Sequence, residues 1–218
     1  MVPVRNEAPG VARYLASLQV LRAQGYTVIV VDGGSDDATA EIAAPLCDAL
    51  LHAPAGRASQ MNAGARHGEA EVLLFLHADT LLPANAIEQV KSAINAGALW
   101  GRFDVTIQGR SRWLPLIGAM MNLRSRFTGI ATGDQAIFVR RDTFESLGGF
   151  ATIPLMEDIE LCKRLRALAW PACLHARVQT SGRRWDERGA LRTMLLMWRL
   201  RWRYWRGESA QHIAEAYR

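Results

Sequence analysis

Residues 73–80, LLFLHADT, form the stretch of sequence from which the fold can be argued. An apolar run ends at Leu76 and is followed by His77 and Asp79, and Pro83 then precedes a helical pattern. A short apolar run of this kind predicts a strand buried on both faces, and the proline predicts the start of a helix. Asp79 therefore stands at the carboxyl end of a strand, the edge of an open α/β sheet where ligands bind. An aspartate here is also a common helix cap, so the stretch alone leaves both interpretations open.

Strand-like and helix-like segments alternate around this stretch. Strands are predicted at residues 1–4, 26–31, 48–52 and 72–76, and helices at residues 9–24, from 38 onward and at residues 57–68. Regular alternation of this kind is typical of a layered α/β fold with a parallel sheet.

Length and composition indicate one folded domain with an extension. The chain has 218 residues, half of them hydrophobic, which is enough for a core. Cys47, Cys162 and Cys173 have neither disulfide-framework nor zinc-site spacing, which favours a reducing compartment. No apolar run is long enough to span a bilayer, and the first ten residues lack the pattern of a signal peptide. We therefore expect a cytoplasmic protein.

The positive charge is concentrated near the end of the sequence. Residues 1–182 carry 17 basic and 17 acidic side chains, whereas residues 183–218 carry 9 and 4. A neutral body argues against a nucleic-acid groove, so no nucleic acid is expected as a partner. We predict a domain over residues 1–182 and a basic, Trp-rich helical extension over residues 183–218.

A second candidate ligand loop lies at residues 30–39, VVDGGSDDAT. Paired glycines let the backbone turn sharply and approach a ligand, and the aspartates offer hydrogen-bond acceptors. The loop has neither the GxGxxG pattern of dinucleotide sites nor the P-loop pattern. A plain turn followed by a capped helix is the alternative interpretation.

Seven segments taken in order resemble the family-two glycosyltransferases of the GT-A fold. They are PVRNE at 3–7, VVDGGSDDAT at 30–39, RASQMNAG at 57–64, FLHADT at 75–80, GDQAIFVR at 133–140, LGGF at 147–150 and EDIEL at 157–161. The likeness covers about residues 1–180, and the wording of the segments is similar to a bacterial subgroup labelled arsenosugar-biosynthesis-type glycosyltransferases. The resemblance implies a layered αβα fold that transfers a sugar from a nucleoside-diphosphate sugar of the UDP or GDP type.

The resemblance also implies roles for single residues. Pro3, Glu7 and Asp32 correspond to neighbours of the nucleotide base, and Arg57 corresponds to a basic residue that meets the nucleotide. Asp134 and Gln135 lie where relatives line the sugar pocket.

The DxD motif of the family maps onto His77, Ala78 and Asp79. The resemblance implies that Asp79 binds Mg²⁺ or Mn²⁺, whereas His77 replaces the first acid and removes one anionic acceptor. A metal ion held by a carboxylate would neutralise the charge that develops on the leaving diphosphate.

Asp158 corresponds to the general base of inverting relatives. An acceptor hydroxyl must lose its proton as it attacks the anomeric carbon, which calls for a carboxylate opposite the leaving group. The alternative is that Glu157, Asp158 and Glu160 only favour the dipole at the start of a helix.

Two segments keep two interpretations each. Residues 109–129 form a core helix or a cover over the acceptor site, with arginines facing a phosphate or carboxylate. From Ala190 on, a helix would gather Leu191, Leu195, Trp198, Trp202 and Trp205 on one side, beside the stripe Arg192, Arg199, Arg203 and Arg206. This apolar face suits peripheral binding to an anionic membrane on its inner side, which would fit a lipid-linked acceptor, or packing on the domain or in a homodimer.

Two other functions remain open at this point. One is a catalytically weak or inactive nucleotide-sugar-binding protein, for which His77 is the only indication. The other is a sugar nucleotidyltransferase, which shares a similar sheet but should open with a glycine-rich loop carrying Arg and Lys rather than with PVRNE.

Overall fold

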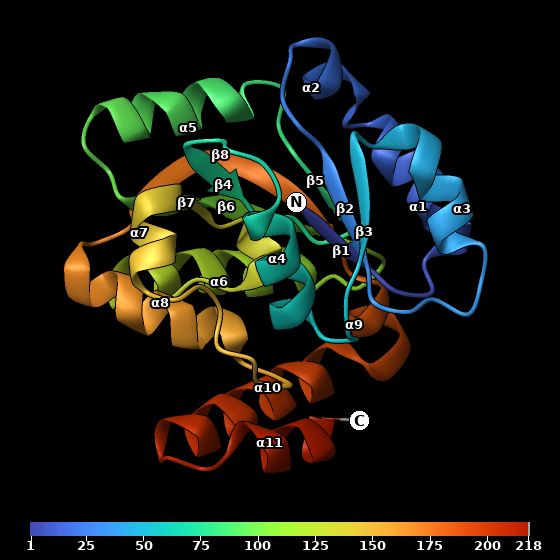
Figure 1. Ribbon diagram of the computed structural model, residues 1–218. Coiled ribbons are helices and arrows are strands. Elements are labelled where there is room, and N and C mark those ends of the chain that lie inside the picture. Colours follow the sequence, from blue (N-terminus) through green and yellow to red (C-terminus); the bar gives the residue numbers. More distant parts are fainter. Residues whose placement is uncertain (218) are drawn as a thin grey trace.

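The computed structural model describes residues 1–217, which form two sheets with helices on both sides (Figure 1). The first sheet is parallel, in the order β1-β2-β3, and consists of β1 (Val2–Val4), β2 (Ile29–Asp32) and β3 (Ala49–His52). All four residues of the central strand β2 are buried, as expected of an apolar strand covered on both faces. The helices of this half are α1 (Ala8–Ala16), α2 (Gln19–Ala23), α3 (Thr39–Ala43), the 3-10 turn η1 (Ala44–Leu46) and α4 (Arg57–Arg66).

The second sheet has five strands in the order β4-β7-β6-β8-β5. Its strands are β4 (Val72–Leu74), β5 (Thr80–Leu81), β6 (Trp100–Gln108), β7 (Phe138–Arg140) and β8 (Ala172–Ser181). Only β6 and β8 run parallel; β4 pairs antiparallel with β7. The predicted α/β fold is confirmed, but the sheet structure is parallel only in part.

The stretch 73–80 lies where the two sheets meet. The Met1 amino group donates to the Leu74 carbonyl over 2.8 Å, and the Leu76 amide donates to the Met1 carbonyl over 3.0 Å. These bonds join the carboxyl end of β4 to the amino end of β1 in parallel orientation, so the chain after β4 continues beside β1 toward the carboxyl end of that strand. The loops that leave both strands therefore open on one edge, as the sequence predicts.

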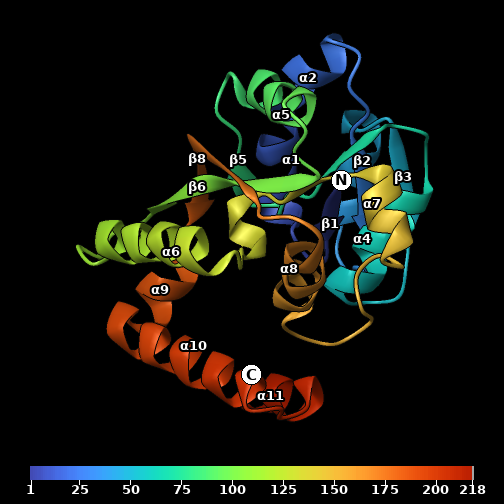
Figure 2. The same ribbon diagram turned by 90° about the vertical axis from the view of Figure 1, so that its left-hand side faces the viewer.

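The remaining helices cover the second sheet and extend below it. They are α5 (Ala86–Asn95), α6 (Leu114–Thr128), the 3-10 turn η2 (Gly133–Gln135), α7 (Arg141–Ser146), α8 (Glu157–Leu168), α9 (Arg183–Arg188), α10 (Ala190–Trp205) and α11 (Ala210–Tyr217). Figure 2 shows α10 and α11 lying below α6 and α8. Within residues 1–217, no helix has the length and apolarity needed to cross a bilayer.

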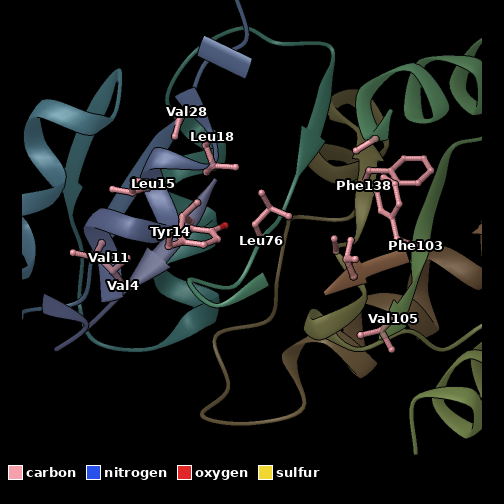
Figure 3. Close-up of a cluster of buried hydrophobic side chains, with 14 of the residues drawn as sticks. Val4, Val11, Tyr14, Leu15, Leu18, Val28, Leu76, Phe103, Val105 and Phe138 are labelled. Atoms are coloured by element: carbon pink, nitrogen blue, oxygen red, sulfur yellow. The ribbon is translucent and has the colours of Figure 1, made fainter. Parts of the chain in front are cut away.

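The main core joins the two sheets. Figure 3 shows Leu76 between the side chains of α1 and β1 on one side and Phe103 and Phe138 on the other. The rings of Phe103 and Phe138 meet edge to face, with centroids 6.1 Å apart. The apolar run that ends at Leu76 is therefore buried against both halves of the molecule.

A buried charge cluster holds α6 on β6. The guanidinium of Arg102, which is fully buried, pairs with Asp104, and Arg126 Nη2 lies 2.7 Å from the second oxygen of Asp104. Asn122 of α6 adds two bonds to the Val105 backbone, over 2.8 and 3.0 Å. Residues 109–129 thus contain a helix packed on the sheet, while Leu123 and Phe127 on its outer side stay exposed.

The predicted helix over residues 9–24 is two helices. The Ser17 hydroxyl donates to the Tyr14 carbonyl over 2.6 Å, a local bond of the kind that competes with helix continuation. Gly25, at a φ of 85°, follows the second helix.

Candidate active site

A cavity of about 400 Å³ opens at the edge where β1 and β4 end. Its walls come from the loops after β1 and β4, from η2, from the first turn of α8 and from α9 and α10. Six of the eight predicted site residues line it, namely Pro3, Glu7, Arg57, Asp79, Asp134 and Asp158. Segments far apart in the sequence therefore converge on one cavity, which supports the prediction that these loops form one site.

Asp32 and Gln135 are the two predicted site residues that do not line this cavity. Asp32 is buried at the end of β2, where its carboxylate accepts the Gly34 and Ser35 amides, both over 3.0 Å, and the Ser35 hydroxyl. Burial raises the pKa of Asp32, but the bonds from Ser35 and Gly34 outweigh it and the pKa is lowered. In this structure Asp32 holds the glycine loop in shape.

Gln135 is fully buried and belongs to the interior of the second sheet. Its amide donates to the Ser125 hydroxyl over 3.1 Å, and its oxygen accepts the Thr132 amide over 3.4 Å in a capping box. A side chain with these partners fixes η2 rather than facing a substrate. Its neighbour Asp134 points the other way, into the cavity.

His77 and Gly133 connect the DxD-like segment to η2. His77 Nδ1 lies 3.3 Å from Asp134 Oδ1. The imidazole lies so close to Gly133 that a β-carbon on this residue would overlap the ring. Glycine at position 133 therefore provides the space that His77 needs, and His77 in turn orients Asp134.

The same glycine fixes the candidate base. The Gly133 amide donates to Asp158 Oδ2 over 2.9 Å, and the Ile159 amide donates to Asp158 Oδ1 over 2.7 Å. Each carboxylate oxygen accepts one backbone N–H, so the side chain is held at the start of α8 with further lone pairs free. The adjacent Glu157 is buried, and burial together with the Asp158 charge raises its pKa.

Acidic groups gather at the Asp79 side of the cavity. Asp79 is open to the cavity, yet the surrounding protein withdraws it from bulk water, and this desolvation and the Asp134 carboxylate raise its pKa. Desolvation also raises the pKa of Glu7, and Asp79 adds to that shift although Arg183 opposes it. A nearby cation stabilises the ionised form of desolvated carboxylates that lie close together.

The pKa of Asp134 is lowered, in contrast to the raised pKa values of Asp79 and Glu7. Burial raises the pKa of this carboxyl, whereas the hydrogen bond and charge of His77 lower it. The guanidinium groups of Arg57 and Arg124 lower it further, so that the net shift is downward. Asp134 is thus an ionised partner of the surrounding cations.

Sequence reasoning missed the residues that close the cavity from the C-terminal side. They are Ser181, Arg183, Arg184, Trp185, Met197, Arg201 and Tyr217. The available signal is the run Arg183-Arg184-Trp185, but the sequence offers no reason to separate this run from the rest of the basic extension. Residues 183–217 therefore supply walls of the site as well as an outer face.

Comparison with known proteins identifies the family and the fold of the chain. The family model described as glycosyl transferase family 2 matches residues 1–147. Similar solved structures include the mannosyltransferase PcManGT from Pyrobaculum calidifontis in complex with GDP-Man and Mn²⁺, at 23% identity and a TM-score of 0.61. That match covers 82% of this chain and 55% of the other.

Two further solved structures share the fold at lower identity. S. aureus TarS in complex with UDP is 16% identical with a TM-score of 0.66, covering 83% of this chain and 59% of that one. Glucosyl-3-phosphoglycerate synthase from Mycobacterium tuberculosis, in complex with Mn²⁺, UDP and glucosyl-3-phosphoglycerate, is 15% identical with a TM-score of 0.57, covering 82% and 68%.

This chain spans a little over half the length of the first two of these structures. None of the curated proteins compared with the chain matches it. The similarity to solved structures shows the fold. The family model covers most of the chain and shows the family. The chain belongs to glycosyl transferase family 2.

Proposed function

We propose that the protein transfers a sugar from a UDP- or GDP-sugar to an acceptor hydroxyl, with inversion at the anomeric carbon and with help from Mg²⁺ or Mn²⁺. The observation that carries the proposal is that Asp79 and Asp158 face one cavity from two different elements. GDP-Man with Mn²⁺ and UDP with Mn²⁺, bound in two structural neighbours, support a nucleotide-sugar donor.

Pro3, Glu7 and Arg57 are the proposed contacts of the nucleotide. All three line the cavity near the carboxyl end of β1. The surrounding protein lowers the pKa of Arg57 by desolvation, but the charges of Glu157 and Asp134 outweigh this effect and the pKa is raised. A permanently charged guanidinium suits the diphosphate. Asp32 contributes indirectly, by shaping the loop after β2.

The donor set around Asp79 fits a divalent ion that is shared with the donor. Among residues 1–217, no three His, Cys, Asp or Glu side chains cluster closely enough to hold a metal without help. Mg²⁺ sites of this class use one or two carboxylates and take their other ligands from substrate phosphates and water. When bound there, the ion would neutralise charge on the leaving diphosphate.

Asp158 is the proposed general base. As the acceptor oxygen bonds to the anomeric carbon, its proton passes to Asp158, and the carbon–oxygen bond to the diphosphate breaks with its electron pair leaving on the nucleotide. A single displacement of this kind inverts the anomeric centre. The two backbone N–H groups that bind Asp158 keep the carboxylate oriented toward the cavity.

Replacement of Asp158 by Asn tests the base and the donor site separately. Asn keeps the size of the side chain but cannot take the proton, so transfer should fall by about 10²- to 10⁴-fold while nucleotide binding survives. Glu160→Gln is the matched control, because Glu160 lies on the same helix, pairs with Arg164 and does not line the cavity. Near-normal turnover of Asp158→Asn would refute the assignment.

A thermal-shift titration with UDP and GDP tests the metal. We expect Mn²⁺ or Mg²⁺ to increase the stabilisation by nucleotide in the wild type and not in Asp79→Ala. Equal stabilisation with EDTA and with Mn²⁺ would contradict the proposed metal site. Binding without transfer to any acceptor would favour the inactive nucleotide-sugar-binding protein, and nucleotidyl transfer to a sugar phosphate would favour the nucleotidyltransferase.

We also propose that the outer face of α10, within the basic extension of residues 183–218, adheres to an anionic membrane. Its predicted apolar side chains, Leu191, Leu195, Trp198, Trp202 and Trp205, are between 48% and 75% exposed. About half or more of each side chain therefore stays open on the outer side of α10, and a membrane or a second copy of the chain could cover this part.

Co-sedimentation with vesicles that contain anionic lipid tests this placement. The variant with Arg192, Arg199, Arg203 and Arg206 changed to Gln should bind less than the wild type, and salt should weaken binding of the wild type. If both proteins stay in the supernatant at low salt and the protein is dimeric in solution, the face is a dimer contact.

A further inference from the structure

A second cavity, of about 360 Å³, lies between α6 and α10 and adjoins the active site. We call it the α6–α10 chamber. Its wall is mainly apolar and rich in methionine, with Ile117, Met120, Met121, Met194, Met197 and Trp198. Asp134, Met197 and Arg201 are among the residues that line both cavities. The chamber therefore adjoins the cavity that Asp158 lines.

Two guanidinium groups in the chamber have buried nitrogens without partners. Among residues 1–217, Nε and Nη2 of Arg124 and Nε of Arg201 are buried and donate to no acceptor of the protein. Arg184, in contrast, pairs with the Tyr217 hydroxyl and stacks on its ring at 3.7 Å. Buried donors without acceptors are costly, so Arg124 and Arg201 create a strong preference for an anion.

The charge around Arg124 agrees with this preference. Burial lowers the pKa of Arg124, and attraction to the Asp158 carboxylate only partly offsets it. The nearby Asp134 is already engaged by His77. The chamber thus combines an apolar, adaptable wall with buried arginine N–H groups that no protein acceptor satisfies, close to the candidate base.

We propose that the α6–α10 chamber binds the acceptor, and that the acceptor is an amphiphile that joins an apolar group to a phosphate or carboxylate. The proposal rests on the proposed function, because it assigns the acceptor half of the same site. The apolar group lies among the methionines and the anion pairs with Arg124 and Arg201. An anion at Arg124 places a neighbouring hydroxyl of the acceptor toward Asp158. The size of the chamber is within the roughly 300–1,000 Å³ of small-molecule sites.

Isothermal titration of the full chain with decyl phosphate, below its micelle-forming concentration, tests the proposal. Decanol supplies the chain without the charge, and inorganic phosphate supplies the charge without the chain. We expect decyl phosphate to bind at least about tenfold more tightly than either. Phenyl phosphate separates the two sources of such an acceptor: comparable binding indicates a small soluble compound, and much weaker binding indicates a lipid.

Arg124→Met removes the charge and keeps an apolar side chain of similar length. We expect it to weaken decyl phosphate binding by roughly tenfold to a hundredfold and to leave decanol unaffected. Arg13→Met is the matched control, because it removes the same charge from the exposed side of α1 and Arg13 lines neither the chamber nor the active site. The control should bind decyl phosphate like the wild type.

Nucleotide binding in the presence of Mn²⁺, measured on the same proteins, keeps the two proposals separate. If the wild type binds UDP or GDP but binds decyl phosphate no more tightly than inorganic phosphate or decanol, only the acceptor proposal fails. If Arg124→Met loses nucleotide binding and keeps decyl phosphate binding, the arginines serve the donor diphosphate and the proposal is overturned. If the wild type binds no nucleotide, the proposed function fails, whatever decyl phosphate does.

Discussion

Replacing Gly133 by Ala should have opposite effects on stability depending on whether His77 is present. A β-carbon at position 133 would overlap the imidazole at Nε2 and Cε1, and even Cδ2 would be only 3.2 Å away. The backbone at Gly133 is not left-handed, so alanine itself fits the local conformation. Overpacking of this kind costs about 1–3 kcal/mol. Rotation of His77 away would avoid the overlap but would give up its contact with Asp134.

Without the imidazole, the same substitution should help. Gly→Ala at a compatible backbone position stabilises by about 0.4–1 kcal/mol, because the unfolded chain loses conformational freedom. In a His77→Ala background, Gly133→Ala should therefore raise the free energy of unfolding. Urea unfolding of the wild type, both single variants and the double variant gives the coupling between the two positions. A loss of stability of similar size in both backgrounds would refute the packing that we describe between His77 and Gly133.

Three further predictions concern the parts of the fold that support the site. Asp104→Ala should lower the free energy of unfolding by about 3–5 kcal/mol, measured in urea, because Arg102 is left buried and unpaired. Asp32→Asn should cost about 1–3 kcal/mol at pH 7. The pKa of Asp32 in the folded protein lies below its unfolded value near 3.9. The stabilisation by Asp32 is therefore present above about pH 4 and is lost as the pH falls through the folded pKa. The free energy of unfolding of the Asn variant should then fall less steeply with decreasing pH than that of the wild type. Leu200→Ala, in a fully buried position, should lower stability by about 2–5 kcal/mol, whereas Leu195→Ala, at 60% exposure, should change it by less than about 0.5 kcal/mol.

The sequence was sufficient to predict which edge of the sheet holds the candidate site. An apolar run that stops at a carboxylate marks the end of a strand, and β4 with Asp79 just beyond it agrees with that pattern. The pairing of β4 was not accessible in the same way. Its partner β7 and the bonds to Met1 depend on segments far away in the chain, for which local periodicity holds no information.

The two neighbours Asp134 and Gln135 show a second limit. Both are polar, and both follow the same loop, so the sequence assigns them together to a substrate pocket. The 3-10 turn η2 separates them, because successive side chains of a turn point in different directions. Asp134 reaches the cavity and Gln135 enters the core, where Ser125 and Thr132 satisfy its amide. Only the surrounding partners decide which of the two faces a ligand.

Helix α10 shows why the composition of the C-terminal segment predicted only one of the two faces of this helix. Its exposed apolar stripe ends in Trp205, and this stripe produced the expectation of a membrane or subunit contact. A second stripe at i, i+3 and i+7, formed by Met194, Met197 and Arg201, lines the α6–α10 chamber instead. Trp198 belongs to both, because it is 48% exposed and also lines the chamber. If the outer face adheres to a membrane, an amphiphilic acceptor would pass from the bilayer surface beside Trp198 into the chamber. The membrane proposal and the acceptor proposal then have one structural basis, since the same helix presents one stripe to the lipid and the other to the substrate.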